Sequence, residues 1–165
     1  SPVIANYIRE RKIDHLVLVS PDMGSVKRAR AMAQRLNARL VIVDKRRPSE
    51  NTAEVMNIIG DVEGMHALIF DDMIDTAGTL VNAAMAIKDH GALDVSACAT
   101  HPVLSGEAMS RLNESVLEKV LVGDSIPLRD KAKACPKLQV LSLAPLIGEA
   151  IRRIHDEESV SCLFR

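Results

Sequence analysis

The stretch from Asp71 to Thr79 combines carboxylates, hydroxyls and a glycine directly after an apolar run. Gly78 allows the backbone to come close to a ligand, and the free N–H groups at the start of a following helix form a site for an anion. The hydroxyls of Thr76 and Thr79 add two donors. We therefore expect a phosphate group to bind at Asp75, Thr76, Ala77, Gly78 and Thr79.

The carboxylates of Asp71 and Asp72 precede this turn and do not themselves attract a phosphate. Carboxylates accept hydrogen bonds from sugar hydroxyls, and they hold Mg²⁺ through water. Phosphate donors beside sugar acceptors indicate a ribose phosphate as the ligand. The alternative is structural: Asp75 caps the helix, and the two preceding carboxylates are simply solvated.

Two further polar stretches also follow apolar runs. Leu16 to Val19 leads into Ser20 to Ser25, and Leu40 to Val43 leads into the charged stretch from Lys45 to Thr52. Ligands of open α/β sheets bind at the carboxyl ends of strands, so both stretches are candidates by position. We expect the second to be an exposed, mobile loop; the alternative is an ordinary run of solvated charges.

Short apolar runs alternate with longer stretches of helical periodicity, which predicts an α/β fold. Continuous apolar strands indicate a parallel sheet that is covered on both faces, here of about five strands flanked by helices. The expected strands are Leu16–Val19, Leu40–Val43, Ala67–Phe70 and Val95–Ala99, with the weaker pair Val120–Val122 and Leu138–Leu141. The expected helices are Ser25–Leu36, Thr79–His90 and Ala144–Ile154.

Length and composition exclude several classes of protein. The 165 residues amount to one domain, and 47% apolar residues can build a core. A net charge of −1 and an aromatic content of 2% do not suit a nucleic-acid partner. Three scattered cysteines fit neither a disulfide scaffold nor a zinc site, so we expect a cytoplasmic location. No apolar run approaches the ~18 residues of a membrane span.

The stretch Phe70 to Thr79 resembles the signature of type I phosphoribosyltransferase folds. Four further stretches narrow the resemblance to the ribose-phosphate pyrophosphokinase family, in its C-terminal half: Ser20–Ser25, Asp44–Pro48, Glu54–Gly64 and Ala99–Gly106. This family makes phosphoribosyl pyrophosphate from ribose 5-phosphate and ATP. The resemblance implies one phosphoribosyltransferase-like domain over residues 1–165, as half of a two-domain subunit, with a C-terminal tail at 156–165.

The resemblance also implies a role for each candidate residue. Asp75 to Thr79 would hold the 5-phosphate, and Asp71 and Asp72 would face the ribose hydroxyls. Lys45 and Arg47 would belong to a catalytic loop. A pyrophosphate loop would consist of Asp22, Met23, Gly24 and Ser25, and the implied Mg²⁺ ligands are Asp71, Asp72 and Asp22.

The family further implies ATP as co-substrate, a homo-oligomer, and an allosteric site that includes Ser159 and Ser161. Because few aromatic side chains are available to stack a base, we expect this chain to bind ribose 5-phosphate without turning it over.

One residue departs from the family pattern. Ser25 stands where a second glycine is usual in the pyrophosphate loop. Two other functions stay open: a non-catalytic regulatory subunit of the same fold, which Ser25 favours slightly, and a nucleobase phosphoribosyltransferase, which would need a base-recognising segment that we do not find.

Overall fold

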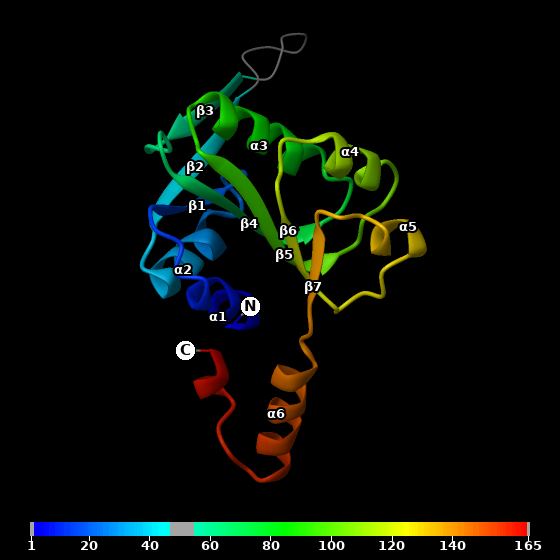
Figure 1. Ribbon diagram of the computed structural model, residues 1–165. Helices are drawn as coiled ribbons and strands as arrows, with labels where there is room; N and C mark the ends of the chain where they lie inside the picture. The colour runs from blue at the N-terminus through cyan, green and yellow to red at the C-terminus, as the bar shows by residue number, and fades with distance from the viewer. Residues whose placement is uncertain (1, 47–54, 165) are drawn as a thin grey trace.

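A computed structural model of the chain describes residues 2–46 and 55–164. Strands and helices alternate along most of it (Figure 1). The strands are β1 (Leu16–Ser20), β2 (Arg39–Arg46), β3 (Val55–Ile59), β4 (His66–Ile74), β5 (Asp94–Pro102), β6 (Val120–Gly123) and β7 (Leu138–Leu141). The helices are α1 (Pro2–Glu10), α2 (Val26–Leu36), α3 (Gly78–Asp89), α4 (Ala108–Glu114), α5 (Asp130–Lys133) and α6 (Ala144–His155), with a short 3₁₀ helix at Ser161–Phe164.

The strands form one sheet in the order β3-β2-β1-β4-β5-β6-β7. All neighbours run parallel except β3, which is antiparallel to β2. The expected α/β fold is confirmed, but the expected number of about five strands is too low. The described residues form seven strands, because both weak apolar runs are strands and because Val55–Ile59 pairs with the end of β2. The polar Asn57 interrupts that stretch, so no continuous apolar run marked it.

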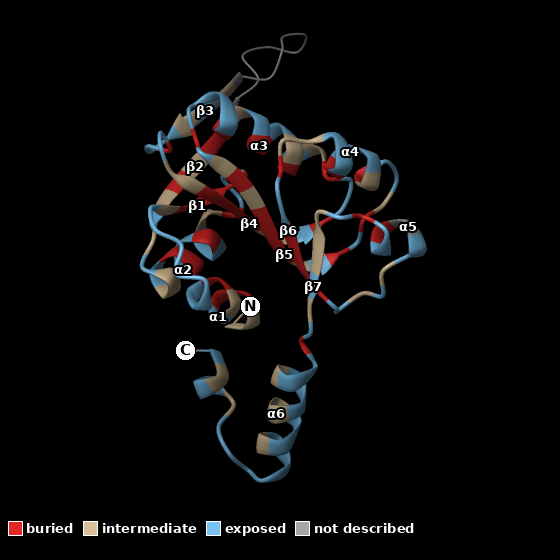
Figure 2. Cartoon of the chain, viewed as in Figure 1, coloured by how far each residue is buried: buried red, intermediate tan, exposed pale blue. Residues whose placement is uncertain are grey.

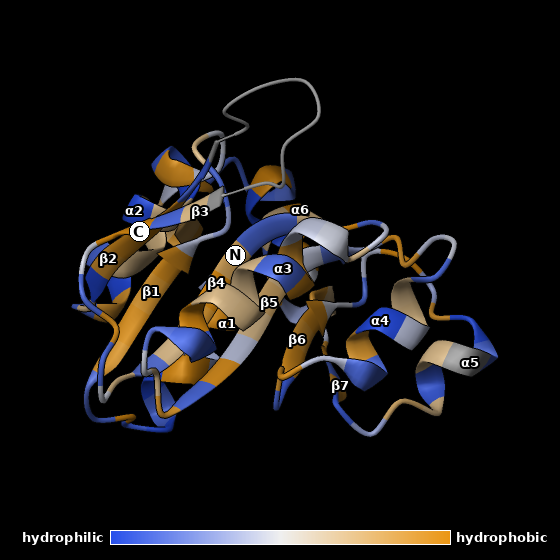
Figure 3. Cartoon of the chain, turned by 90° about the horizontal axis from the view of Figure 1, so that it is seen from above, coloured by the Kyte–Doolittle hydropathy of each residue, from blue (hydrophilic) through white to orange (hydrophobic). Residues whose placement is uncertain are grey.

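Apolar side chains fill both faces of the sheet. Helices α1 and α2 cover one face, where Ile4, Ile8 and Met32 pack with Leu18 and Phe70. Helices α3 and α4 cover the other, where Ala83, Ile87 and Leu112 pack with residues such as Val95 and Val120. Figure 2 shows the buried residues along the central strands, and Figure 3 shows β1 and β6 mainly in the hydrophobic colours. Two covered faces are what a parallel sheet requires.

The three cysteines are free, as their scattered positions predicted. Cys98 and Cys135 are buried, and Cys162 is exposed. Burial raises the pKa of the Cys98 thiol to about 12, because a thiolate is poorly solvated there. None of the described helices is long and apolar enough to cross a membrane.

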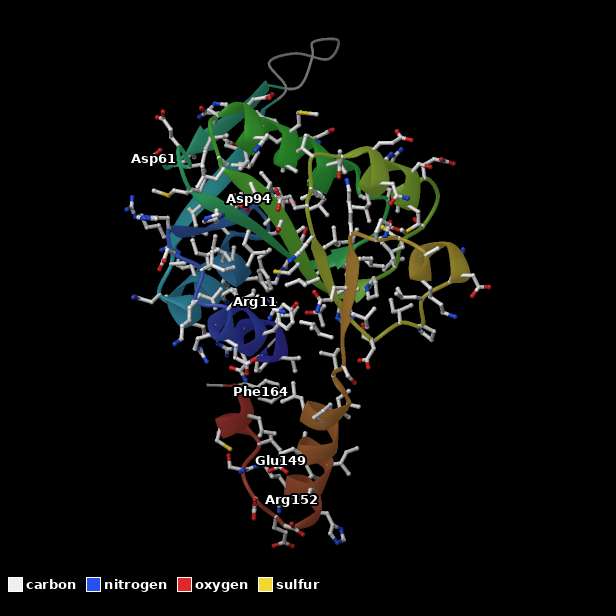
Figure 4. The ribbon with its side chains drawn as sticks, viewed as in Figure 1. Arg11, Asp61, Asp94, Glu149, Arg152 and Phe164 are labelled. Atoms are coloured by element: carbon white, nitrogen blue, oxygen red, sulfur yellow. The ribbon has the colours of Figure 1, made fainter. Side chains whose placement is uncertain are left out.

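Helix α6 stands apart from the sheet and buries none of its residues (Figure 1). Ile147, Ile151 and Ile154 recur at helical spacing and are 54%, 63% and 67% exposed. On another side of the helix, Glu149 pairs with Arg152 and Arg153 (Figure 4). These hydrogen bonds lower the pKa of Glu149 to about 2. The helix thus presents an apolar stripe that no described residue covers.

Gly123 ends β6 where there is no room for a side chain. An added Cβ would lie 2.7 Å from the Thr100 carbonyl oxygen and 2.9 Å from Leu143 Cδ1. We predict that Gly123→Ala lowers the free energy of unfolding by about 1–3 kcal/mol, measured by urea denaturation. Gly148→Ala is the matched control, because no atom beyond its chain neighbours and the backbone of its own helix lies within 4 Å of the added methyl group. Equal stability of Gly123→Ala and the wild type would contradict this packing.

Candidate functional site

The site lies where the sheet changes its direction of winding. Strands β1 and β4 are neighbours in the sheet, but the chain leaves β1 through α2 toward β2 and leaves β4 through α3 toward β5. The two connecting helices cover opposite faces, so the carboxyl ends of β1 and β4 form a topological switch point. Such a switch point is where open α/β sheets bind ligands. The turn after β1 and the turn after β4 are two of the three stretches that the sequence had indicated.

The turn after β4 presents its polar groups to solvent. Asp75, Thr76 and Thr79 are exposed, and α3 begins at Gly78. The left-handed residue of this turn is Ala77, with φ 62°, and not the glycine. Backbone strain of this kind costs of order 1–3 kcal/mol and clusters at functional sites. A left-handed residue beside right-handed ones also turns successive N–H groups toward one concave surface, which favours an anion.

Gly78 contributes open space rather than an unusual backbone angle. An added Cβ would meet nothing nearer than Arg111 Nη1 at 3.7 Å and Thr76 Oγ1 at 3.9 Å. The fold therefore has room for a side chain at this position. The expectation that Gly78 permits the close approach of a ligand remains consistent with this geometry and stays a prediction.

The carboxylate of Asp71 is the most constrained group of the site. Its Oδ1 accepts hydrogen bonds from the hydroxyl of Ser25 at 2.9 Å and from the backbone N–H of Asp72 at 2.9 Å. Arg28 Nη2 lies 3.5 Å from Asp71 Oδ1 and 3.3 Å from Asp72 Oδ1. Burial raises the pKa of Asp71, and the bonds from Asp72 and Ser25 oppose that shift. The ends of β1 and β4 are thereby joined side chain to side chain.

The turn after β1 is closed by hydrogen bonds of its own. The hydroxyl of Ser20 donates to the Asp22 carbonyl at 2.8 Å, and the backbone N–H of Ser25 donates to Asp22 Oδ1 at 2.8 Å. Met23 is 57% exposed and Gly24 is also exposed. Ser25 is buried and has φ −87°, a value that any residue adopts. The serine therefore causes no backbone strain at the position where the resemblance implies a glycine, and its hydroxyl donates the hydrogen bond to Asp71.

The residues predicted to hold Mg²⁺ are Asp71, Asp72 and Asp22. Among the residues that the structure describes, no three His, Cys, Asp or Glu side chains gather closely enough to hold a metal ion. Asp22 is engaged with the N–H of Ser25. Mg²⁺ commonly takes one or two carboxylates, several waters and substrate phosphates. Asp71 and Asp72 fit that pattern, in which the substrate completes the coordination.

The candidate catalytic residues lie at the edge of the described chain. Lys45 is exposed near the end of β2 and pairs with Met56 of β3. The expectation of a loop from Lys45 onward is therefore wrong for its first two residues, because they extend a β-hairpin. Arg47 lies outside the described residues.

The candidate allosteric residues belong to the exposed C-terminal tail. The hydroxyls of Ser159 and Ser161 lie 2.9 Å apart. The Ser159 carbonyl accepts a hydrogen bond from Arg153 Nη1 at 3.2 Å. These contacts tie the two serines to α6 and leave their proposed role as a prediction.

Three site residues were missed by sequence reasoning. Arg28 faces both carboxylates from the first turn of α2, three residues after Ser25. Ser105 donates its hydroxyl to Asp75, and Arg111 donates to the Thr76 carbonyl at 2.8 Å. The i, i+3 spacing gave a signal for Arg28, whereas Ser105 and Arg111 reach the site only through the fold.

The geometry of Ser25 makes a prediction about the glycine that it replaces. Because φ is negative and the hydroxyl bonds Asp71, we expect Ser25→Gly to lower the free energy of unfolding by about 1 kcal/mol, measured by urea denaturation. Ser25→Ala serves as the control, because it removes the same bond without freeing the backbone. A gain of stability in Ser25→Gly would show that the position needs a glycine.

Comparisons with known proteins agree with this arrangement. A family described as "Phosphoribosyl synthetase-associated domain" matches residues 43–165. The chain is 57% identical over 164 residues to a ribose-phosphate pyrophosphokinase from Caldanaerobacter subterraneus, and 54% identical to one from Neisseria meningitidis. Each alignment covers 99% of this chain but only 52% and 50% of the relatives. The chain thus spans about half the length of the curated relatives that it matches.

Solved structures support the same assignment. The phosphoribosylpyrophosphate synthetase from Mycobacterium smegmatis superposes with a TM-score of 0.85 at 37% identity, over 94% of this chain and 50% of that one. A purine phosphoribosyltransferase from Pyrococcus horikoshii superposes with a TM-score of 0.50 at 17% identity, over 86% of this chain and 78% of that one, and it supports the fold alone. On the family match, the identities and the shared fold, the chain belongs to the ribose-phosphate pyrophosphokinase (phosphoribosyl pyrophosphate synthetase) family.

Proposed function

We propose that this chain carries the ribose 5-phosphate site of a ribose-phosphate diphosphokinase. The proposal rests on one observation. Donors that suit a phosphate and carboxylates that suit sugar hydroxyls lie at the same switch point of the sheet. A strained turn at the start of α3 offers N–H and hydroxyl donors to a phosphate, and the carboxylates of Asp71 and Asp72 precede it on the same strand. A sugar phosphate has acceptors at one end and hydroxyl donors at the other, so it matches both.

In the proposed reaction the 1-hydroxyl oxygen of ribose 5-phosphate attacks the β-phosphorus of ATP. The new O–P bond forms as the bond between the β-phosphorus and the bridging oxygen to the α-phosphate breaks. AMP leaves with that oxygen, and the hydroxyl proton goes to solvent. Phosphoryl transfer of this kind depends on positioning and charge stabilisation. Mg²⁺ would supply positive charge to the phosphates, held through Asp71 and Asp72.

Each candidate residue either positions a substrate or supplies positive charge to the transition state. The turn from Asp75 to Thr79 fixes the 5-phosphate, and the acidic pair orients the ribose hydroxyls. The turn from Asp22 to Ser25 borders the position of the transferred pyrophosphate. Lys45, at the end of β2, and Arg47 bring positive charge to the transition state, where preorganised charge is most effective.

The chain is one phosphoribosyltransferase-like domain of a larger subunit, with its tail at residues 156–165. Two observations support this. The curated relatives are about twice as long as the aligned region, and the apolar stripe of α6 has no cover among the described residues. With an aromatic content of 2%, the chain offers little to stack an adenine, so the rest of the subunit provides the ATP site. The whole enzyme is a cytoplasmic homo-oligomer, with Ser159 and Ser161 near an allosteric site.

Two alternatives share the fold. A nucleobase phosphoribosyltransferase would consume phosphoribosyl pyrophosphate and release pyrophosphate, and it needs a segment that recognises a base. A regulatory subunit would keep the fold without turnover. The acidic pair and Lys45 are both present, which favours the enzyme.

The proposal is tested by AMP release from ribose 5-phosphate, ATP and Mg²⁺ in a protein that has the full length of the relatives. We expect turnover there and none from the 165-residue chain. Lys45→Ala and Arg47→Ala are expected to lower kcat by about 100-fold, as for a lost transition-state donor, with the ribose 5-phosphate affinity changed far less.

Lys133→Ala is the matched control, because Lys133 is exposed on α5 and pairs only locally with Asp130. Release of pyrophosphate with a nucleobase would indicate the transferase instead. Binding of ribose 5-phosphate without turnover at full length would indicate the regulatory subunit.

A further inference from the structure

The turn from Asp75 to Thr79 is held from outside by residues 104–111, which link β5 to α4 and form the start of α4. The backbone N–H of Leu104 donates to the Ile74 carbonyl at 2.9 Å, and that of Ser105 donates to the Asp75 carbonyl at 3.1 Å. Arg111 Nη1 donates to the Thr76 carbonyl at 2.8 Å. Three successive carbonyls are thus bonded to one segment, which we call the 104–111 clamp.

The bonded carbonyls determine where the neighbouring N–H groups point. The described peptide bonds include no cis bond. In a trans peptide unit the carbonyl of one residue and the N–H of the next point in opposite directions. The N–H groups of Asp75, Thr76 and Ala77 therefore point away from the clamp. The left-handed Ala77 then leads into the exposed first N–H groups of α3, which extends the row of donors.

The clamp also holds the carboxylate of Asp75 away from the row of backbone N–H donors. Asp75 accepts a hydrogen bond from the Ser105 hydroxyl, so its carboxylate is held on the clamp side. The guanidinium of Arg111 places a positive charge beside the start of α3, with Nη1 3.7 Å from the position of a Cβ on Gly78. Leu104 has φ 50°, and a bulky residue in that region is a backbone outlier. Both the clamp, at Leu104, and the turn, at Ala77, therefore contain a residue with a strained, left-handed backbone.

We propose that Arg111 is a positioning residue for the phosphate-binding turn. Of the three hydrogen bonds from the clamp to carbonyls described above, two come from backbone N–H groups and one comes from a side chain, that of Arg111. Arg111 fixes the peptide unit that carries the N–H of Ala77, and its charge lies beside the start of α3, with Nη1 3.7 Å from the position of a Cβ on Gly78. The inference rests on the proposed function, in which this turn receives the 5-phosphate.

The test is calorimetric titration of ribose 5-phosphate, and separately of inorganic phosphate, into the 165-residue chain. Arg111→Met keeps the length of the side chain but removes its donors and charge. We expect it to weaken both ligands by about 10-fold, with an unchanged urea midpoint because Arg111 is exposed. Arg111→Lys, which retains a charged donor, is expected to recover most of the affinity. Arg30→Met, an exposed change on α2, is the control and is expected to stay within twofold.

The outcomes separate this inference from the proposed function. If the wild-type chain binds neither ligand, the proposed function fails, and the role of Arg111 fails with it. If the wild type binds and Arg111→Met binds within twofold, only the positioning role is overturned. If Arg111→Met loses both affinity and stability, and Arg111→Lys restores neither, the role of Arg111 is structural. That outcome would also overturn the positioning role.

Discussion

The parallel pairing of β1 with β4 is the constraint on which the site depends. The register, from Leu16 opposite His66 to Val19 opposite Ile69, brings both strands to the same edge of the sheet. The turn after β1 can then donate the Ser25 hydroxyl to Asp71 at the end of the apolar part of β4. The helices that follow β1 and β4 cover opposite faces of the sheet, so the ends of the two strands form a switch point of the kind at which open α/β sheets bind ligands. A different strand order would separate the acidic pair from the turn after β1.

The site places carboxylates beside the donors that are expected to bind an anion. The carboxylates would repel that anion, so hydrogen bonds orient them away from the backbone donors. Asp71 is bonded to Ser25, Asp75 is bonded to Ser105, and the backbone donors of the turn point away from the clamp. The cost is visible as burial of Asp71, which raises its pKa, and as the left-handed Ala77. Strain and desolvation of this kind are expected where a site is preorganised.

Local patterns predicted the parts of this protein that depend on local physics. Apolar runs marked six strands, and helical periodicity marked α2, α3 and α6, because burial and period act within one segment. Strand β3 was missed, since Asn57 interrupts its apolar run and the pairing with β2 is not a local property. Asp71 to Thr79 was found from its residue types and spacing, and Arg28 gave a local signal in its spacing from Ser25, but Ser105 and Arg111 join the site only through tertiary packing. The left-handed backbone at Ala77 was not predicted, because alanine gives no local signal for it.

The most direct test of the account is a map of backbone amide shifts in the ¹⁵N-labelled chain as ribose 5-phosphate is added. The account predicts the largest shifts at Asp75, Thr76, Ala77, Gly78 and Thr79, with smaller ones at Asp71 and Asp72. His66 and Asp94 pair at the starts of β4 and β5, at the edge of the sheet opposite the site (Figure 4 labels Asp94). Shifts centred on these two residues would contradict the account. A saturating titration that moved no amide of the turn would contradict it as well.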